Sequence, residues 1–174
     1  TLAKLNDHGR NLICNAAMHW DIERTRLLIE FGADVNAYRT GGHNPLYHVT
    51  NSIPNGKHNI EAGKALLEIL IQQGVDVNQR TGVGQMLPLH MVARRGTTPL
   101  AELLLDNGAD IEARDKAGET PLRRAVNCAQ ERMVILLRER GADPFSKDRF
   151  GRTLFDVART DKIRKALAIG GDSY

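Results

Sequence analysis

Glycine recurs along this chain at a nearly constant interval, and this interval limits the fold more than any other feature of the sequence. The glycines fall into two sets, and the spacings within the first set are 33, 42, 34 and 33 residues. A period of about 33 residues indicates a repeated unit that buries its apolar face against neighbouring copies, and it argues against one globular core. The first set is Gly9, Gly42, Gly84, Gly118 and Gly151, and the second is Gly32, Gly74, Gly108 and Gly141.

The clearest copy of the unit occupies residues 115–144. Thr120 and Pro121 are typical of the cap and first turn of a helix, so we expect a short helix to begin there. A polar break follows, and a second apolar stripe then begins at Met133. This stripe ends at Gly141, and a glycine in that place is typical of a helix C-terminus. Because isolated helices below about 12 residues are marginal in water, the pattern predicts helix, turn, helix and loop units that stabilise one another by stacking.

Similar phrases close and open the units. The closing phrases read G-A-D-V-N at 32–36, G-V-D-V-N at 74–78, G-A-D-I-E at 108–112 and G-A-D at 141–143. The opening phrases read N-L-I-C at 11–14, N-P-L-Y at 44–47, L-P-L-H at 87–90, T-P-L at 120–122 and T-L-F-D at 153–156. On these residues the chain resembles the ankyrin repeat family over nearly its whole length. The resemblance implies an all-α solenoid of stacked helix-turn-helix units joined by β-hairpin-like loops.

We expect a single ankyrin repeat domain over residues 1–174. The charged stretch at 161–167 is expected to form a C-terminal capping helix, because the end repeat of a solenoid needs a wettable outer face. The expected repeats are about 6–38, 39–79 with an insertion at 53–63, 80–113 and 114–146, followed by a capping unit at 147–169.

Two features of the early repeats leave alternatives open. Trp20, the only tryptophan, either packs across the turn between the two helices of the first repeat or serves as an anchor for a partner. The insertion at 53–63 is either part of a binding face or a tolerated excursion. Within it, Asn59 is expected to cap a second helix that starts early and is therefore lengthened.

The charge balance is nearly even, with 24 basic and 21 acidic residues and a formal net charge of +3. This balance gives no argument for a nucleic-acid or membrane-surface partner, although residues 88–174 hold sixteen of the basic and thirteen of the acidic side chains. No apolar run approaches the roughly 18 residues of a membrane span and no signal peptide is found, so we expect no membrane insertion. The chain does not begin with Met, and we expect it to be part of a larger protein.

The two cysteines are predicted to lie in the first helices of the first and fourth repeats. Stacking would separate these repeats by far more than the ~7 Å between Cα atoms that a disulfide allows. Cys14 and Cys128 are therefore expected to be thiols, which favours a reducing, cytoplasmic compartment.

The polar residues show no pattern typical of catalysis or metal binding. Of the six histidines, His43 and His48 stand five residues apart without a nearby cysteine, and the resemblance implies that His90 ties neighbouring loops together by hydrogen bonds. The carboxylates recur with the period, which indicates turn or cap acceptors rather than a catalytic pair. We therefore expect no enzyme activity, no cofactor and no metal. The periodic carboxylates are Asp34, Asp76, Asp110 and Asp143.

The resemblance implies that the concave face, formed by the first helices and the loop tips, binds another protein. We expect a monomeric adaptor, scaffold or targeting domain. Its candidate residues are aromatic and polar early in the chain and basic later, which favours an acidic partner segment over nucleic acid. The alternative is an enzyme-associated or nucleic-acid-binding regulatory domain that uses the basic C-terminal half. The candidates are Arg10, Met18, His19, Trp20, Tyr38, His43, Arg94, Arg95, Arg114, Lys116, Arg124, Arg149 and Arg152.

Overall fold

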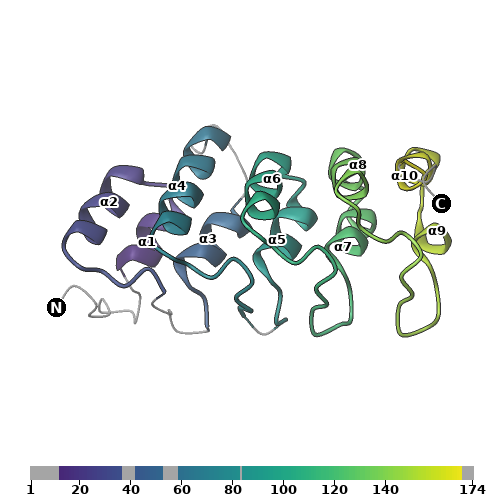
Figure 1. Ribbon diagram of the computed structural model, residues 1–174, viewed down its shortest axis with the longest axis horizontal. Coiled ribbons are helices and arrows are strands. Elements are labelled where there is room, and N and C mark those ends of the chain that lie inside the picture. Colours follow the sequence, from purple (N-terminus) through teal and green to yellow (C-terminus); the bar gives the residue numbers. More distant parts are fainter. Residues whose placement is uncertain (1–11, 37–41, 53–58, 83, 170–174) are drawn as a thin grey trace.

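Two parallel rows of short helices make up the molecule (Figure 1). The computed structural model describes residues 12–36, 42–52, 59–82 and 84–169, and ten α-helices lie within these ranges. We call the first row, which lies beside the loops, the inner row, and the second the outer row. The inner row is α1 (Leu12–Met18), α3 (Pro45–Asn51), α5 (Pro88–Arg95), α7 (Pro121–Asn127) and α9 (Leu154–Val157). The outer row is α2 (Ile22–Glu30), α4 (Ile60–Gln72), α6 (Thr98–Asp106), α8 (Glu131–Glu139) and α10 (Asp161–Leu167).

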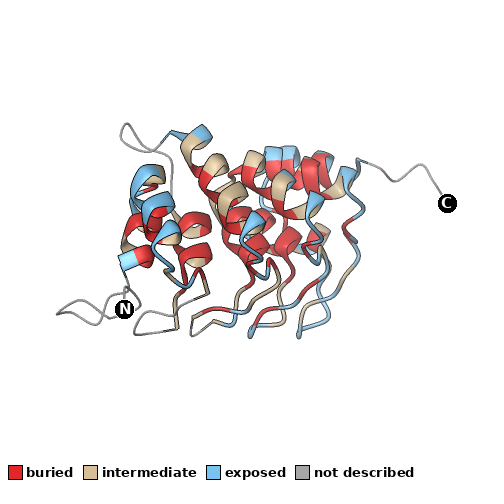
Figure 2. Cartoon of the chain, turned by 60° about the vertical axis from the view of Figure 1, so that its left-hand side comes forward, coloured by how far each residue is buried: buried red, intermediate tan, exposed pale blue. Residues whose placement is uncertain are grey.

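The core runs through the whole stack because each helix packs on the next one of its own row and on its partner in the other row. Buried positions continue from one end of the array to the other (Figure 2). One core position recurs in four successive repeats, always with an aliphatic side chain that is at most 1% exposed. Burial of this kind is the main source of stability for helices too short to persist alone. The four residues are Ile13, Leu46, Leu89 and Leu122.

The helix starts confirm the expected caps. The Thr120 hydroxyl accepts the N–H of Arg123 at 3.3 Å, and Pro121 occupies the first turn of α7. The Asn59 side chain accepts the N–H of Glu61 at 3.1 Å, so α4 begins early. As a result α4 has 13 residues, whereas α2, α6 and α8 have nine each. Residues 53–58 of the insertion lie outside the described part of the chain.

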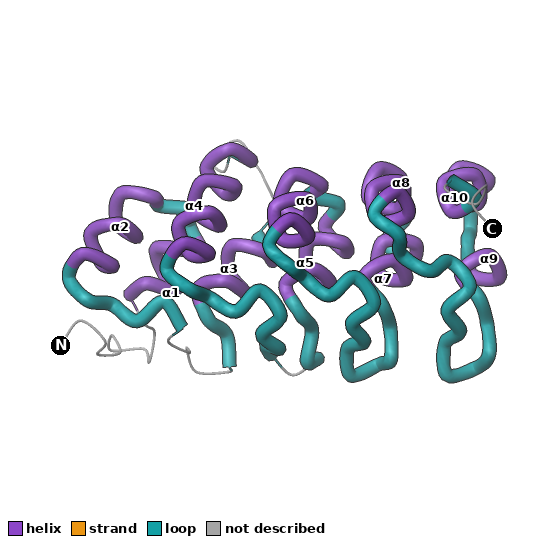
Figure 3. Tube along the Cα trace, in the orientation of Figure 1, coloured by secondary structure: helices purple, strands orange, loops and turns teal. Residues whose placement is uncertain are grey.

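The loops are organised by side-chain acceptors, and Figure 3 shows no strand among the described residues. Thr81 and Met86 form an isolated antiparallel bridge in one described loop. The periodic carboxylates act as the turn acceptors that the sequence predicts, each accepting the backbone N–H two residues further on. The carboxylate to N–H distances are 2.8 Å at Asp34, 2.8 Å at Asp76, 3.0 Å at Asp110 and 2.8 Å at Asp143.

A side-chain hydrogen bond ties three of the repeats to the loop that follows. In each case the donor stands at the fourth position of an opening phrase, and the acceptor is the carbonyl just before the next opening phrase. We call these bonds the inter-repeat ties. They run from Cys14 Sγ to His43 O at 3.7 Å, from His90 Nε2 to Glu119 O at 2.9 Å and from Arg123 Nη2 to Arg152 O at 2.7 Å.

His90 forms its tie as a neutral imidazole. Its ring is fully buried, and Nδ1 accepts the backbone N–H of Leu87 at 3.3 Å, so Nε2–H donates to the carbonyl of Glu119. Burial lowers the pKa of His90 more than the hydrogen bond to Glu119 and the nearby Asp115 carboxylate raise it. The expected loop-tying role of this histidine is therefore confirmed, and the neutral form is the one that makes both bonds.

Candidate functional site

We use the name inner face for the exposed parts of the inner helices together with the loops that lie beside them (Figure 1). Two rungs of equivalent residues run along the helix ends, because successive inner helices pack side by side. The first rung is Met18, Asn51, Arg94 and Asn127, and the second is His19, Ser52, Arg95 and Cys128. The middle of the inner face therefore carries two adjacent arginines from α5, with neutral residues on both sides.

Asn51 on α3 holds both of these arginines. Its Oδ1 accepts Nη2–H of Arg94 at 2.8 Å and Nη2–H of Arg95 at 3.2 Å. Nε of each arginine is buried and has no hydrogen-bond partner among the described residues, and none of the described aspartates or glutamates pairs with either side chain. Burial and then the charge of Arg94 lower the pKa of the Arg95 guanidinium. The two cations therefore lie together, half-buried, against one neutral acceptor.

An aromatic pair borders the arginines on the side of α3. The rings of His43 and Tyr47 are stacked, with centroids 3.9 Å apart and planes 4° from parallel. The Tyr47 hydroxyl accepts Nδ2–H of Asn51 at 3.4 Å, which leaves Oδ1 of the same amide for the arginines. Behind them, Gln130 donates to the backbone carbonyl of Arg94 at 3.2 Å. The arginine pair is therefore held from two sides, by Asn51 of α3 and by Gln130 in the turn between α7 and α8.

Arg124, one helix further along, is neutralised within the chain. Its Nε–H donates to Asp115 Oδ2 at 2.8 Å, and its Nη1 lies 3.0 Å from Glu119 Oε2. The Asp115 carboxylate is fully buried, and Glu119 also accepts Nδ2–H of Asn127 at 3.1 Å. Arg124 thus has two carboxylate partners, whereas the arginine pair of α5 has none among the described residues.

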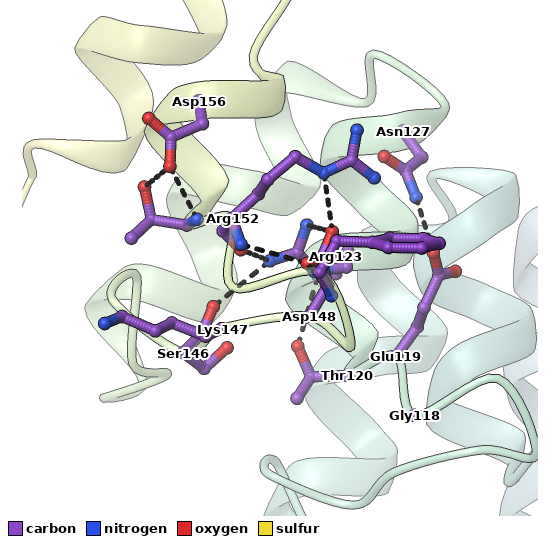
Figure 4. Close-up of polar contacts among 12 residues, drawn as sticks. Gly118, Glu119, Thr120, Arg123, Asn127, Ser146, Lys147, Asp148, Arg152 and Asp156 are labelled. Carbon is purple, nitrogen blue, oxygen red and sulfur yellow. Dashed lines mark hydrogen bonds and ion pairs between the residues drawn. The ribbon is translucent and has the colours of Figure 1, made fainter.

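The last loop holds a second set of internal partners (Figure 4). Arg123, only 3% exposed, donates to Ser146 O at 3.1 Å and to Arg152 O at 2.7 Å, and it lies 3.5 Å from Asp148. Arg152 pairs with the same carboxylate at 3.0 Å. Burial raises the pKa of Asp148, but hydrogen bonds from Arg152 and Phe150 outweigh it, so the net pKa is lowered.

The tip of this loop exposes an aromatic ring between two cations. Phe150 is 66% exposed, and the guanidinium carbons of Arg149 and Arg152 lie 4.8 and 5.2 Å from its centroid. Phe145, also 66% exposed, packs on Phe155 with ring centroids 5.7 Å apart. Sequence reasoning missed both exposed rings, since a single phenylalanine in a polar loop carries no periodic signal.

The comparisons with known proteins identify the repeat. Residues 57–148 match the family described as "Ankyrin repeats (3 copies)". The chain belongs to the ankyrin repeat family. Ankyrin repeats are protein-interaction modules, and the family is generally non-catalytic.

The relatives that match this ankyrin repeat chain are longer proteins. It is 36% identical over 122 residues to human ankyrin repeat and SOCS box protein 16, covering 70% of this chain and 25% of the relative. It is 38% identical over 79 residues to the ankyrin repeat and LEM domain-containing protein 1 homolog of Caenorhabditis elegans, covering 44% and 11%. It is 36% identical over 74 residues to the potassium channel KOR2 of Oryza sativa subsp. japonica, covering 42% and 10%. The chain therefore spans about a tenth to a quarter of the length of these relatives.

Trp20, one of the candidate partner-binding residues of this ankyrin repeat chain, is buried in the structure. Its side chain is 4% exposed, and its ring lies against Gly63 of α4, where an added Cβ would stand 2.8 Å from the indole. The ring therefore reaches the outer helix of the next repeat. Trp20 has a φ of 52°, the left-handed conformation that Gly96 and Ala129 adopt at the same place in later repeats.

The other candidates divide into three groups. Met18 is half-buried and His19 exposed at the end of α1, while Arg10 and Tyr38 lie outside the described residues. Arg114 is exposed and donates to the carbonyls of Gly118 at 2.9 Å and Lys147 at 3.4 Å. Lys116, Arg149 and Arg152 are exposed on loop tips. The described basic candidates thus lie on inner helices or in loops, and they differ in whether a carboxylate accompanies them.

No helix in the described ranges is long and apolar enough to cross a membrane. Within the same ranges, no group of three or more histidine, cysteine, aspartate or glutamate side chains is arranged to hold a metal ion.

Proposed function

We propose that this chain is the interaction module of a larger protein, an adaptor, scaffold or targeting unit that binds an acidic segment of a partner protein through its inner face. The observation that carries the proposal is the arginine pair of α5. Arg94 and Arg95 share one neutral acceptor and lie beside each other without a described carboxylate. Two like charges held together destabilise a monomer, and such arrangements occur where a ligand supplies the missing charge.

The charge distribution of the inner face supports a partner that binds at its centre. Arg124 is paired with Asp115 and Glu119, and Arg152 is paired with Asp148. These carboxylates neutralise the two arginines, so the electrostatic field that the arginines present to a partner is weak. Lys116 and Arg149 are exposed in the loops of the next two repeats after that of α5 and add positive charge there. Charges of this kind steer association and fix orientation more than they add affinity.

No observation favours the alternative of nucleic-acid binding. A net charge of +3 is a small basic excess for a surface that would follow a phosphate backbone, and Arg123, Arg124 and Arg152 of the later repeats already pair with carboxylates of the chain. We therefore propose that the partner is a protein and that the chain is monomeric. The proposal also places the chain in a reducing compartment such as the cytoplasm.

The test compares two charge-reversed variants of the same chain. Arg94→Glu with Arg95→Glu reverses the inner-face pair, and the control Arg26→Glu with Arg132→Glu reverses two exposed arginines of the outer helices α2 and α8. Partners captured from a lysate are compared by quantitative mass spectrometry, and the strongest is then measured as a purified protein at low and high salt. We expect the inner-face variant to lose the partner, the control to keep it, and the association rate of the wild type to fall with salt. A partner that binds the inner-face variant equally well at both salt concentrations would refute the proposal and shift attention to the surface around Met18.

A further inference from the structure

We infer that Arg94, Arg95 and Asn51 form an oxyanion site that receives the phosphate group of a phosphorylated side chain in the partner. This inference rests on the proposed function, because it names the group that the same surface recognises. It is narrower than the proposed function, since an acidic segment could bind there through carboxylates alone.

The donors of the site outnumber what one carboxylate can accept. Each guanidinium carries five N–H groups in a planar fork. One Nη2–H of each is used by Asn51, at 2.8 Å for Arg94 and 3.2 Å for Arg95, and Nε–H of each is buried. The remaining Nη–H groups of both arginines have no hydrogen-bond partner among the described residues. A carboxylate has two oxygens with about four acceptor sites, whereas a phosphate monoester has three terminal oxygens and can accept from both forks with sites to spare.

The charge of the site also fits a dianion. Two guanidiniums with one neutral amide between them carry a local charge of +2, and the carboxylates of Asp115 and Glu119 are already paired with Arg124. A phosphorylated side chain carries about −1.5 to −2 charges near neutral pH, and a single carboxylate carries only −1. The phosphate group is therefore the side-chain anion that compensates the pair most fully.

The site is built before any ligand arrives. Asn51 is oriented by the Tyr47 hydroxyl at 3.4 Å, and the Arg94 backbone is held by Gln130 at 3.2 Å. Both guanidiniums are half-buried and share one acceptor, so little of their rotamer freedom remains to be lost on binding. A flexible pair of surface lysines would have the same charge but not this arrangement of forks.

The closing experiment uses small probes and the chain alone, so that its result does not depend on finding a partner. N-acetyl-phosphoserine amide and N-acetyl-glutamate amide are titrated at matched ionic strength while the Nε–Hε signals of the arginines are followed by NMR. We expect the phosphoserine probe to bind about tenfold more tightly than the glutamate probe at about pH 7.5, with the largest shifts at Arg94 and Arg95. At about pH 5 the phosphate loses its second charge, and we expect this preference to shrink toward unity.

A variant that keeps the positive charge tests whether the bidentate geometry of the guanidinium groups matters or only their charge. Arg94→Lys with Arg95→Lys retains both charges, and we expect it to lose about tenfold in phosphoserine affinity while the matched Arg26→Lys with Arg132→Lys does not. Equal affinities of the wild type for the two probes, or shifts spread evenly over all exposed arginines, would overturn the phosphate site. That result would leave the proposed function standing, because the latter fails only if a protein partner ignores reversal of the pair.

Discussion

The tie made by Arg123 gives the sharpest quantitative prediction, because its bonds replace those of the histidine found one repeat earlier. Arg123→Met fills a similar volume but removes the bonds to Arg152 O at 2.7 Å and Ser146 O at 3.1 Å. Hydrogen bonds to charged groups contribute ~1.5–3 kcal/mol each, so their sum has an upper limit of ~6 kcal/mol. Both carbonyls lie near the surface and can be hydrated after the change, so we expect a loss of ~2–4 kcal/mol in the free energy of unfolding.

The Asp148 carboxylate does not add the cost of an orphaned charge. It keeps Arg152 at 3.0 Å and the N–H groups of Phe150 and Arg152 at 2.8 and 3.0 Å. The effect of Arg123→Met is therefore expected in the tie itself, between α7 and the loop that leads to α9. Equilibrium urea unfolding measures the total loss, and hydrogen exchange shows whether α9 and α10 become less protected than α5.

Two further variants make this test decisive. Arg123→His restores a donor of the His90 type toward Arg152, and we expect it to recover roughly half of the loss above about pH 6.5. Arg149→Met removes an exposed arginine of the same loop and is expected to change stability by less than ~0.5 kcal/mol. The reasoning is refuted if Arg123→Met costs no more than Arg149→Met, or if exchange increases evenly along the array.

The remaining predictions concern His90, Gly63 and the cysteines. Burial lowers the folded-state pKa of His90, so the unfolded state takes up a proton at a higher pH than the folded state. We therefore expect the free energy of unfolding to be constant above about pH 6.5. Below that pH we expect it to fall by at most ~1.36 kcal/mol per pH unit. Urea unfolding of the wild type and His90→Asn at several pH values checks this, since the variant lacks that slope. Gly63→Ala is expected to cost up to ~2 kcal/mol by thermal or urea unfolding, because an overpacking cost of ~1–3 kcal/mol against the Trp20 indole is offset by a gain of ~1 kcal/mol in helix propensity. The loss is expected to vanish in a Trp20→Leu background, and a stabilised Gly63→Ala would show that the contact is not tight. Alkylation without reductant followed by mass spectrometry is expected to find Cys14 and Cys128 as two free thiols, and a disulfide between them would contradict the stacked repeats.

Local chemistry explains why the repeat and its helix starts could be predicted. Thr120 and Asn59 lie next to the N–H groups that they cap, so their role is contained within a few residues of sequence. The lengthened α4 follows from the early cap at Asn59. Stacking then follows from the period, since each apolar stripe needs a neighbouring stripe to cover it.

The candidate site could be predicted only in outline, because its contacts join distant residues. The Trp20 indole packs against α4 because Gly63 has no side chain and leaves room for the ring. The two residues are far apart in the sequence, and no local pattern at either one indicates this contact. The pairing of Arg124 with Asp115 depends on the conformation of the loop that brings them together. The role of Arg123 could have been predicted from its position, because it occupies in its opening phrase the place that His90 occupies in the preceding one. The two residues make equivalent hydrogen bonds, but the change from histidine to arginine made this equivalence hard to see in the sequence.

The inter-repeat ties also give the solenoid a mechanical direction. A thiol, a weak donor, makes the tie at Cys14, a neutral imidazole makes it at His90, and a permanently charged guanidinium makes it at Arg123. In a linear array each repeat is held only by its neighbours, so a weaker tie makes its own interface easier to open under load. Of the three tied interfaces, we therefore expect the one at Cys14 to open first when the array is pulled from both ends, and the one at Arg123 to open last.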